Sequence, residues 1–375
     1  MFDIYAMLEE TYQRGGTDLH LIPGEVPRVR VLGRLVPCDE VGALSPEETR
    51  RICEGLIPEG RMEEYRREKT VDFSFSATDK IRIRANIFHQ RKGVEGAFRV
   101  LPKDPIPLEE LGLPTETVKG LLSKPRGLIL VTGPTGSGKT TTLAGMVDWL
   151  NRTYPKHILT IEDPVEYVIE SKKGIVTQRE VGTHVPTFHD ALKYILRQDP
   201  DVALVGEMRD LDSIFTTLTI AETGHLTLAT LHTNLAVETI NRVIGVFPAH
   251  QQAQVRYILS FVLLGVISQM LIPTPKGLVL ASEVLIATSG VKNLIREGKV
   301  HQIQSLLETE SRHGSRSMKR SLQDLMKRGV LTKDMVANFY GEEVSMPFSK
   351  EEEGDKTTLS ASKDFLFRGT GRRNR

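Results

Sequence analysis

The sequence predicts an α/β protein in which a small α+β unit precedes a mostly parallel sheet covered by helices on both faces. Three observations support this fold class. Before residue 102, short segments alternate apolar and polar side chains, as strands with one buried face do. After residue 107, short apolar runs alternate with helix-length segments, which is typical of parallel sheets. A glycine-rich loop at residues 133–140 joins one of these runs to a helical segment.

Residues 1–101 are expected to form the first unit. Its predicted elements are, in order, a helix over residues 3–14, a hairpin over 29–36 that turns at Gly33, a helix from 46 toward 56 that Ser45 caps, and strands over 71–75, 81–87 and 96–101. In the strand over 81–87, alternation places Arg82, Arg84 and Asn86 on one face and isoleucines on the other. The unit therefore presents a strand face that carries positive charge.

Residues 102–107 read Pro-Lys-Asp-Pro-Ile-Pro, which predicts a stiff linker between two domains. Residues 108–288 are expected to form the domain with the parallel sheet. Its predicted strands are short and apolar, over 128–131, 157–161, 202–205 and 226–230. Functional side chains are expected just after the carboxyl ends of these strands, where such sheets bind their ligands.

The carboxyl-terminal part is predicted to be mostly helical. The apolar window over 258–272 is too short to span a bilayer, and it is predicted to be a buried helix closed by Pro273. Residues 289–344 are expected to be helical and basic. Residues 345–375 contain few apolar side chains and are expected to be a disordered tail.

Composition narrows the class of protein. The net charge of +1 provides no global attraction to nucleic acid or membranes, so no nucleic-acid partner is expected. The two cysteines, Cys38 and Cys53, cannot form a disulfide framework and indicate a reducing compartment. The amino terminus lacks the pattern of a signal peptide. We therefore expect a cytoplasmic protein without a transmembrane segment.

The glycine-rich loop carries the strongest chemical signal. It matches G-x-x-x-x-G-K-[ST] in full, as Gly133-Pro134-Thr135-Gly136-Ser137-Gly138-Lys139-Thr140. Glycines let backbone N–H groups turn toward a phosphate, and the following helix adds positive partial charge. Lys139 is expected to reach the β- and γ-phosphates, and the Thr140 hydroxyl to bind Mg²⁺. Thr141 is assigned to the same nucleotide site, for which ATP is favoured because no N-K-x-D guanine motif follows.

Two carboxylates follow neighbouring strands and are candidates for catalysis. The acidic segment over 161–166 ends in Glu166, and a solvated acidic turn is the alternative interpretation. The segment over 202–210 resembles a Walker B strand, but Gly206 occupies the usual aspartate position. Glu207 then becomes the water-orienting candidate, and a simple ion pair with Arg209 is the alternative.

Histidines and arginines complete the set of candidates. His225 and His232 lie at the two ends of one strand, roughly 20 Å apart at about 3.3 Å per residue, which argues against a metal pair. His232 is a candidate to sense the γ-phosphate. For the arginine that stabilises transition-state charge, Arg84 and Arg99 are the candidates, supplied by a neighbouring subunit, and a solvated face is the alternative.

Together these segments resemble the secretion ATPase superfamily, most closely the PilT-like type IV pilus retraction ATPases. The resemblance covers residues 1–340 and rests on the phosphate loop and on the segments over 161–167, 177–182, 196–210 and 224–234. It implies a hexameric ring motor with an amino-terminal PAS-like domain and a RecA-like ATPase domain, with ATP between them. It also implies roles for particular residues: Lys139 and Thr140 in binding phosphate and Mg²⁺, Glu207 and Glu166 as catalytic carboxylates, and His225 and His232 as the histidine-box pair.

The resemblance also bears on the direction of the motor. Assembly and type II secretion ATPases usually carry a long amino-terminal extension and a four-cysteine zinc motif, and neither is present in this sequence. The segment over 293–299 resembles the retraction signature A-I-R-N-L-I-R-E, although Gly290-Val291-Lys292 replaces its first three residues. The expected function is ATP-driven pilus retraction and twitching motility, through a platform protein of the inner membrane to which the motor is peripherally attached.

Other functions remain open at this point. One is a PilU-like accessory ring subunit with little hydrolysis, which would assist a paralogous retraction ATPase. A second is a pilus assembly or type II secretion ATPase. A third is a nucleic-acid motor, against which the near-neutral charge argues.

Overall fold

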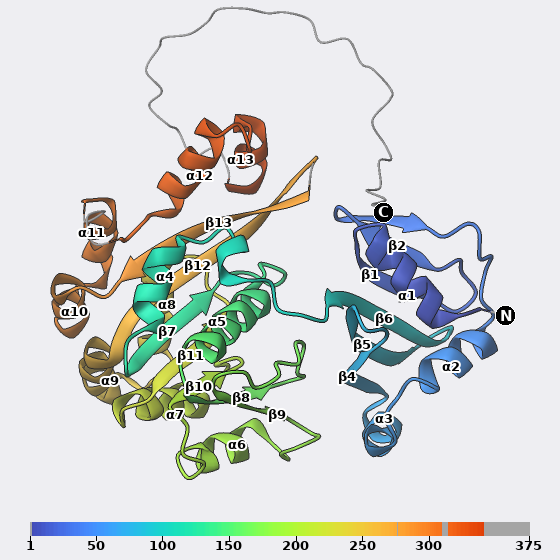
Figure 1. Cartoon of the computed structure of the whole chain (residues 1–375), viewed down its shortest axis with the longest axis horizontal. Coiled ribbons are helices and arrows are strands. Elements are labelled where there is room, and N and C mark those ends of the chain that lie inside the picture. The colour runs from blue at the N-terminus through green and yellow to red at the C-terminus, as the bar shows by residue number, and fades with distance from the viewer. Residues whose placement is uncertain (1, 276, 310–313, 341–375) are drawn as a thin grey trace, which may run out of the picture.

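The computed structural model describes residues 2–275, 277–309 and 314–340. These residues form two separate sheets with helices, so the fold is α/β as the sequence predicts (Figure 1). The tail over 345–375, which the sequence predicts to be disordered, lies outside the described residues. None of the helices in the described ranges combines the length and the apolarity needed to cross a bilayer.

The first sheet has six antiparallel strands in the order β3-β2-β1-β6-β5-β4. The strands are β1 (Gly16–Leu21), β2 (Arg28–Val31), β3 (Arg34–Pro37), β4 (Thr70–Ser76), β5 (Ile81–Gln90) and β6 (Gly93–Pro102). The helices that accompany them are α1 (Ile4–Gln13), α2 (Pro46–Glu54), η1 (Glu59–Arg61) and α3 (Met62–Glu68). Alternation in β5 buries Ile81, Ile83 and Ile87 in the core and leaves Arg82 and Arg84 on the opposite face.

Local chemistry explains where the first helices begin. The Asp3 side chain accepts hydrogen bonds from the backbone N–H groups of Tyr5 and Ala6, which would otherwise have no partner at the start of α1. Ser45 and Glu48 form a complete capping box at α2, and Pro46 occupies the first position of that helix.

The second sheet has seven strands in the order β13-β12-β7-β11-β10-β8-β9. The strands are β7 (Gly127–Thr132), β8 (His157–Glu162), β9 (Ile175–Glu180), β10 (Val202–Val205), β11 (Leu226–Leu231), β12 (Leu263–Thr274) and β13 (Gly277–Ile286). All neighbours are parallel except β12 and β13. Residues 103–107 connect β6 to η2 (Leu108–Glu110), which precedes this sheet.

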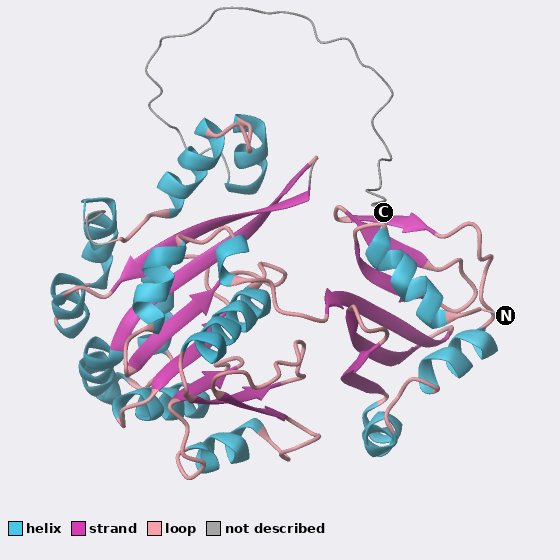
Figure 2. Ribbon diagram, in the orientation of Figure 1, coloured by secondary structure: helices cyan, strands magenta, loops and turns pink. Residues whose placement is uncertain are grey.

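Helices cover both faces of this sheet (Figure 2). They are α4 (Thr115–Leu122), α5 (Lys139–Thr153), α6 (Phe188–Ile195), α7 (Leu211–Glu222), α8 (Ala236–Gly245) and α9 (Ala249–Val262). In β7, Leu128 and Leu130 enter one hydrophobic core, whereas Ile129 and Val131 enter the other. The central strands are therefore buried on both sides, which explains their unbroken apolar sequences.

The carboxyl-terminal part is helical, with α10 (Ser289–Arg296), η3 (Val300–Gln302), α11 (Ile303–Thr309), α12 (Met318–Lys327) and α13 (Lys333–Tyr340). Helices α12 and α13 pack on the β12–β13 hairpin through a small core that includes Ile272, Met318 and Leu322.

The helix predicted over 258–272 is wrong. Helix α9 ends at Val262, and β12 begins at Leu263. Strand β12 pairs with β7 on one side and with β13 on the other. Its side chains enter the hydrophobic cores on both faces of the sheet, so its sequence is mostly apolar without a strand-like alternation. In an apolar run of this kind, the periodicity of hydrophobic residues cannot distinguish a buried strand from a buried helix. Strands β1, β9 and β13 were also not predicted.

Candidate active site

The glycine-rich loop runs from the end of β7 to the start of α5. Gly133, Gly136 and Gly138 have φ angles of 149°, 79° and 85°. Residues other than glycine rarely adopt such positive φ angles. A Cβ atom at Gly133 would lie 2.2 Å from the carbonyl oxygen of Gln269 in β12. The loop therefore needs glycine there both for its backbone conformation and for the close approach of β12.

Gln269 also binds the loop directly, a contact that the sequence analysis did not assign. Its Nε2 donates a hydrogen bond of 2.7 Å to the carbonyl oxygen of Ser137. The side chain is 1% exposed, and both its Oε1 and the Ser137 hydroxyl are buried without a hydrogen-bond partner. The sequence does contain one sign of this contact, a glutamine inside an apolar run. A buried amide needs a polar partner, so a glutamine at such a position indicates a specific hydrogen bond.

Lys139 connects the loop to the catalytic candidates. Its Nζ donates to the carbonyl oxygens of Gly133 and Pro134, at 2.9 and 3.1 Å, and lies 3.4 Å from Nδ1 of His232. Burial lowers the pKa of Lys139, and the nearby carboxylates of Glu207 and Glu166 oppose this effect.

Glu207 and His232 follow β10 and β11, which are neighbours in the sheet. The Glu207 Oε1 atom lies 3.1 Å from Nε2 of His232, and its Oε2 accepts from Nε of Arg209 at 2.8 Å. Glu207 thus makes the ion pair with Arg209 and also lies within a connected set of side chains that leads through His232 to Lys139. Parallel strands end at the same edge, which is why residues distant in sequence meet here.

Glu166 lies at the junction between the two sheets. Its Oε1 accepts a hydrogen bond of 2.8 Å from Nη1 of Arg84 in β5, and its side chain is largely buried. The neighbouring Arg82 donates to the carbonyl oxygen of Val165, with its Nη2 at 3.0 Å. Arg61 makes a third contact of this kind, to the carbonyl oxygen of Val181 at 3.2 Å.

Arg99 has a different partner from Arg84, although the two residues are directly opposite in the β5–β6 register. Its Nε donates to Oδ1 of Asp18 in β1 at 3.0 Å. Of the two arginine candidates, only Arg84 contacts a carboxylate that follows β8.

The structure does not bring His225 to the phosphate loop. His225 precedes β11, and its carbonyl oxygen accepts from the N–H of Gly127 at the start of β7, whereas the loop follows the end of β7. Its Nδ1 lies 3.0 Å from the carbonyl oxygen of Ile220 and 3.2 Å from the Thr223 hydroxyl. These contacts join the end of α7 to the start of β11.

The segment over 163–174, between β8 and β9, is fixed by two polar side chains that the sequence analysis did not assign. Gln178 donates from Nε2 to the carbonyl oxygen of Tyr167 at 2.8 Å and accepts from the N–H of Ile169 at 2.7 Å. Glu180 accepts from the N–H of Val165 at 2.9 Å. Both belong to the stretch over 177–182, so this stretch shapes the backbone around Glu166.

Glu162 ends β8 among other acidic groups. Burial, together with the charges of Glu166 and Glu180, raises its pKa to about 7, although hydrogen bonds with Thr160 and Gln178 favour its charged form. The site therefore contains a carboxyl group that changes its protonation state near neutral pH.

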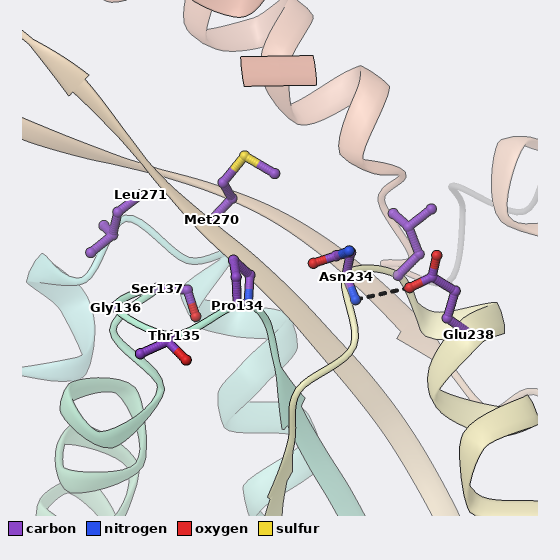
Figure 3. A pocket seen from close by; sticks show the side chains of 9 residues that line it. Pro134, Thr135, Gly136, Ser137, Asn234, Glu238, Met270 and Leu271 are labelled. Carbon is purple, nitrogen blue, oxygen red and sulfur yellow. Dashed lines mark hydrogen bonds between the residues drawn. The ribbon is translucent and has the colours of Figure 1, made fainter. Parts of the chain in front are cut away.

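Two cavities border these residues. One, of about 540 Å³, lies between the loop and β12, and Figure 3 shows its lining side chains from residues 134–137, Asn234, Glu238, Met270 and Leu271. Within it the backbone N–H of Asn234 donates to Glu238 at 3.0 Å. The second, of about 360 Å³, is lined by residues that include Glu207, Arg209, His232 and Arg242.

The side chains around the phosphate loop determine which metal the site could hold. Within the described ranges, no group of three or more His, Cys, Asp or Glu side chains could hold a metal ion. Thr140 lies in the first turn of α5 and is partly exposed. This arrangement fits a cation such as Mg²⁺, which keeps several waters and binds largely through phosphate oxygens.

The chain is similar to several known proteins. A family model described as type II/IV secretion system protein matches residues 62–276. The Pseudomonas aeruginosa type IV pilus retraction ATPase PilT is 44% identical over 88% of this chain and 96% of its own length. A twitching motility protein of Neisseria gonorrhoeae is 43% identical over 86% of both chains, and the P. aeruginosa type IV pilus ATPase PilU is 38% identical over 87% and 85%. A crystal structure of the pilus retraction motor PilT with bound ADP superposes with a TM-score of 0.80, at 44% identity over 90% of this chain and 97% of that one.

The fold and the phosphate loop define a P-loop ATPase. The chain belongs to the type II/IV secretion system protein family, and within that family it is PilT-like. The resemblance inferred from the sequence is thereby confirmed.

Gly133→Ala should weaken nucleotide binding, because its Cβ would collide with backbone of β12 and its φ angle is unfavourable for alanine. We expect a loss of affinity of about tenfold or more for a fluorescent ADP analogue, measured by titration. Gly120→Ala in α4 is the matched control, because a Cβ there meets nothing within 4 Å. Wild-type affinity in Gly133→Ala would contradict the packing described.

Glu162→Gln should change the pH dependence of stability. Because the pKa of Glu162 is raised from 4.5 to about 7, the folded chain keeps a proton that the unfolded chain has lost, so stability falls as pH rises through this window. The isosteric amide does not titrate, so it removes this loss of stability at high pH. Urea unfolding at about pH 5 and about pH 8 should show the variant gaining stability relative to wild type at the higher pH. Glu222 is exposed, so the control Glu222→Gln should show no such gain. If the stability of Glu162→Gln changed with pH as that of the wild type does, the raised pKa of Glu162 would be contradicted.

Proposed function

We propose that this protein is an ATP-hydrolysing motor that drives type IV pilus retraction and twitching motility. The observation that carries the proposal is the connected set of Glu207, His232 and Lys139 beside the phosphate loop, in a chain that matches a retraction ATPase over nearly its whole length. The similarity to a PilT structure with bound ADP supports nucleotide binding by this chain.

The roles of the side chains follow from what hydrolysis requires. Lys139 supplies positive charge to the β- and γ-phosphates, and Glu207 orients the attacking water. His232 lies between Glu207 and Lys139, so it is placed to respond to the γ-phosphate that Lys139 binds. Glu166 is proposed as a second catalytic carboxylate, and Arg84 is preferred to Arg99 as the charge-stabilising arginine because it contacts Glu166.

Mg²⁺ is the proposed metal, and the Thr140 hydroxyl is the protein group that would hold it. When bound, Mg²⁺ neutralises charge on the β- and γ-phosphates. In this role the nucleotide would supply oxygen ligands of its own.

The assembly and its place in the cell are part of the same proposal. We propose a homohexameric ring in the cytoplasm that acts on an inner-membrane platform protein of the pilus machinery. The support is the similarity to a protein described as a pilus retraction motor.

An accessory, PilU-like role is the second candidate. It is favoured by the departure at Gly290-Val291-Lys292, in the helix that the retraction signature occupies. Against it, identity to PilT exceeds identity to PilU, 44% compared with 38%, over similar lengths. In the accessory role the ring would assist a paralogous ATPase and turn over little ATP itself.

Glu207→Gln should preserve ATP binding and lower turnover by about a hundredfold or more, because the amide cannot accept the proton of the attacking water. Steady-state hydrolysis and the affinity for a fluorescent ADP analogue measure the two effects. The matched control, Asp212→Asn, changes an exposed carboxylate close in sequence and should keep both values. If Glu207→Gln loses nucleotide affinity instead, Glu207 is a structural or metal-holding group.

Pilus retraction is tested in a deletion strain complemented with wild type or with Glu207→Gln. Excess surface pili, corrected together with twitching only by the wild type, would support a catalytic retraction motor. Correction by both versions would favour the accessory role. Cells without pili would indicate an extension motor, and an unchanged pilus count would refute the pilus function.

A further inference from the structure

Tyr167 directly follows the proposed catalytic Glu166 and connects it to the phosphate-loop helix. Its hydroxyl lies 3.1 Å from the Thr141 hydroxyl, in the first turn of α5. Thr141 in turn follows Thr140, the proposed Mg²⁺ ligand. The hydrogen bond between Tyr167 and Thr141 therefore links the neighbour of Glu166 to the neighbour of Thr140.

The ring and the hydroxyl of Tyr167 make separable contributions. The side chain is 2% exposed and belongs to the core on the α5 side of the second sheet, together with Leu143 and Val147. A phenylalanine ring would fill the same space, so the hydroxyl is not needed for packing. Either hydroxyl can donate in the bond between Tyr167 and Thr141, whereas a phenylalanine ring can neither donate nor accept.

Other contacts already hold the backbone around Tyr167. Gln178 binds the carbonyl oxygen of Tyr167 and the N–H of Ile169, while Glu180 and Arg82 bind Val165. These contacts attach the segment to β9 and to the first sheet. The segment also contacts the far end of α5, where Asn151 binds the carbonyl oxygen of Glu170 and the N–H of Lys172. The Tyr167 hydroxyl attaches it to the first turn of α5, beside the phosphate loop.

We propose that Tyr167 is a positioning residue, whose hydroxyl fixes Glu166 relative to the phosphate-loop helix during ATP hydrolysis. This inference rests on the proposed function. Catalytic groups need placement within a fraction of an ångström, and a single hydrogen bond from a rigid, buried ring provides it. Nucleotide binding depends on the loop itself, so the hydroxyl should matter for turnover and little for affinity.

The test is Tyr167→Phe in the full-length chain, assayed with Mg²⁺ and ATP. We expect kcat to fall about three- to tenfold, which is the effect of one hydrogen bond, with KM and the affinity for a fluorescent ADP analogue unchanged within about twofold. The matched control is Tyr65→Phe, which removes another buried tyrosine hydroxyl, one that donates to Glu54 at 3.1 Å within the first sheet's core. It should leave kcat unchanged.

A second variant tests the bond itself. Thr141→Val removes the other hydroxyl and, because Thr141 is assigned to the nucleotide site, can lower turnover on its own account. Adding Tyr167→Phe to Thr141→Val should cost nothing further, because the bond is already absent. Additive losses, or a kcat for Tyr167→Phe within about twofold of wild type, would overturn the inference. If the wild type does not hydrolyse ATP, the proposed function itself is wrong. If the wild type is active and Tyr167→Phe is equally active, only the role of Tyr167 is wrong.

Discussion

The close packing of β12 against the phosphate loop is the constraint on which the rest of the site depends. The Gln269 carbonyl occupies the space that a side chain at residue 133 would need, and its amide binds the carbonyl oxygen of Ser137. Because β12 pairs with β7, the loop is fixed to the middle of the sheet. Every other strand that supplies a candidate group then ends at a set position relative to the loop: β8 for Glu166, β10 for Glu207 and β11 for His232.

The amino-terminal sheet takes part in the site through its charged face. Arg84 neutralises Glu166, while Arg82 and Arg61 bind backbone carbonyl groups of the segments around it. The acidic side chains Glu162, Glu166 and Glu180 lie close together, and the raised pKa of Glu162 reflects their mutual repulsion as well as burial. Charge from the first sheet thus offsets a cluster of negative charge that the second sheet concentrates beside the nucleotide site, which links the two sheets electrostatically.

Sequence reasoning succeeded where the signal is local and failed where it depends on tertiary pairing. The phosphate loop, the Ser45 cap and the alternation in β5 each follow from neighbouring residues, so their structures were predictable. Strand β12 was predicted as a helix because both of its faces pack in hydrophobic cores, which gives it a mostly apolar sequence without alternation. The contacts of Gln178 and Tyr167 were not predicted, because their partners lie on other segments and no sequence motif indicates the pairing. The two histidines were correctly placed at opposite ends of one strand, yet only His232 lies beside the loop.

The three arginine contacts between the sheets differ in what they recognise, and this has a consequence for sequence divergence. Arg61 and Arg82 bind the carbonyl oxygens of Val181 and Val165, which every amino acid possesses. Substitution at those two valines leaves the polar contacts intact, but Val165 is buried and Val181 packs against the core, so these positions should accept other apolar side chains while both arginines are retained. Arg84 binds the side chain of Glu166, and loss of Arg84 would leave the largely buried charge of Glu166 without its partner. Among homologues, compensating pairs of substitutions should therefore concentrate at positions 84 and 166, whereas position 182 should stay glycine because a Cβ there would collide with the Arg61 guanidinium.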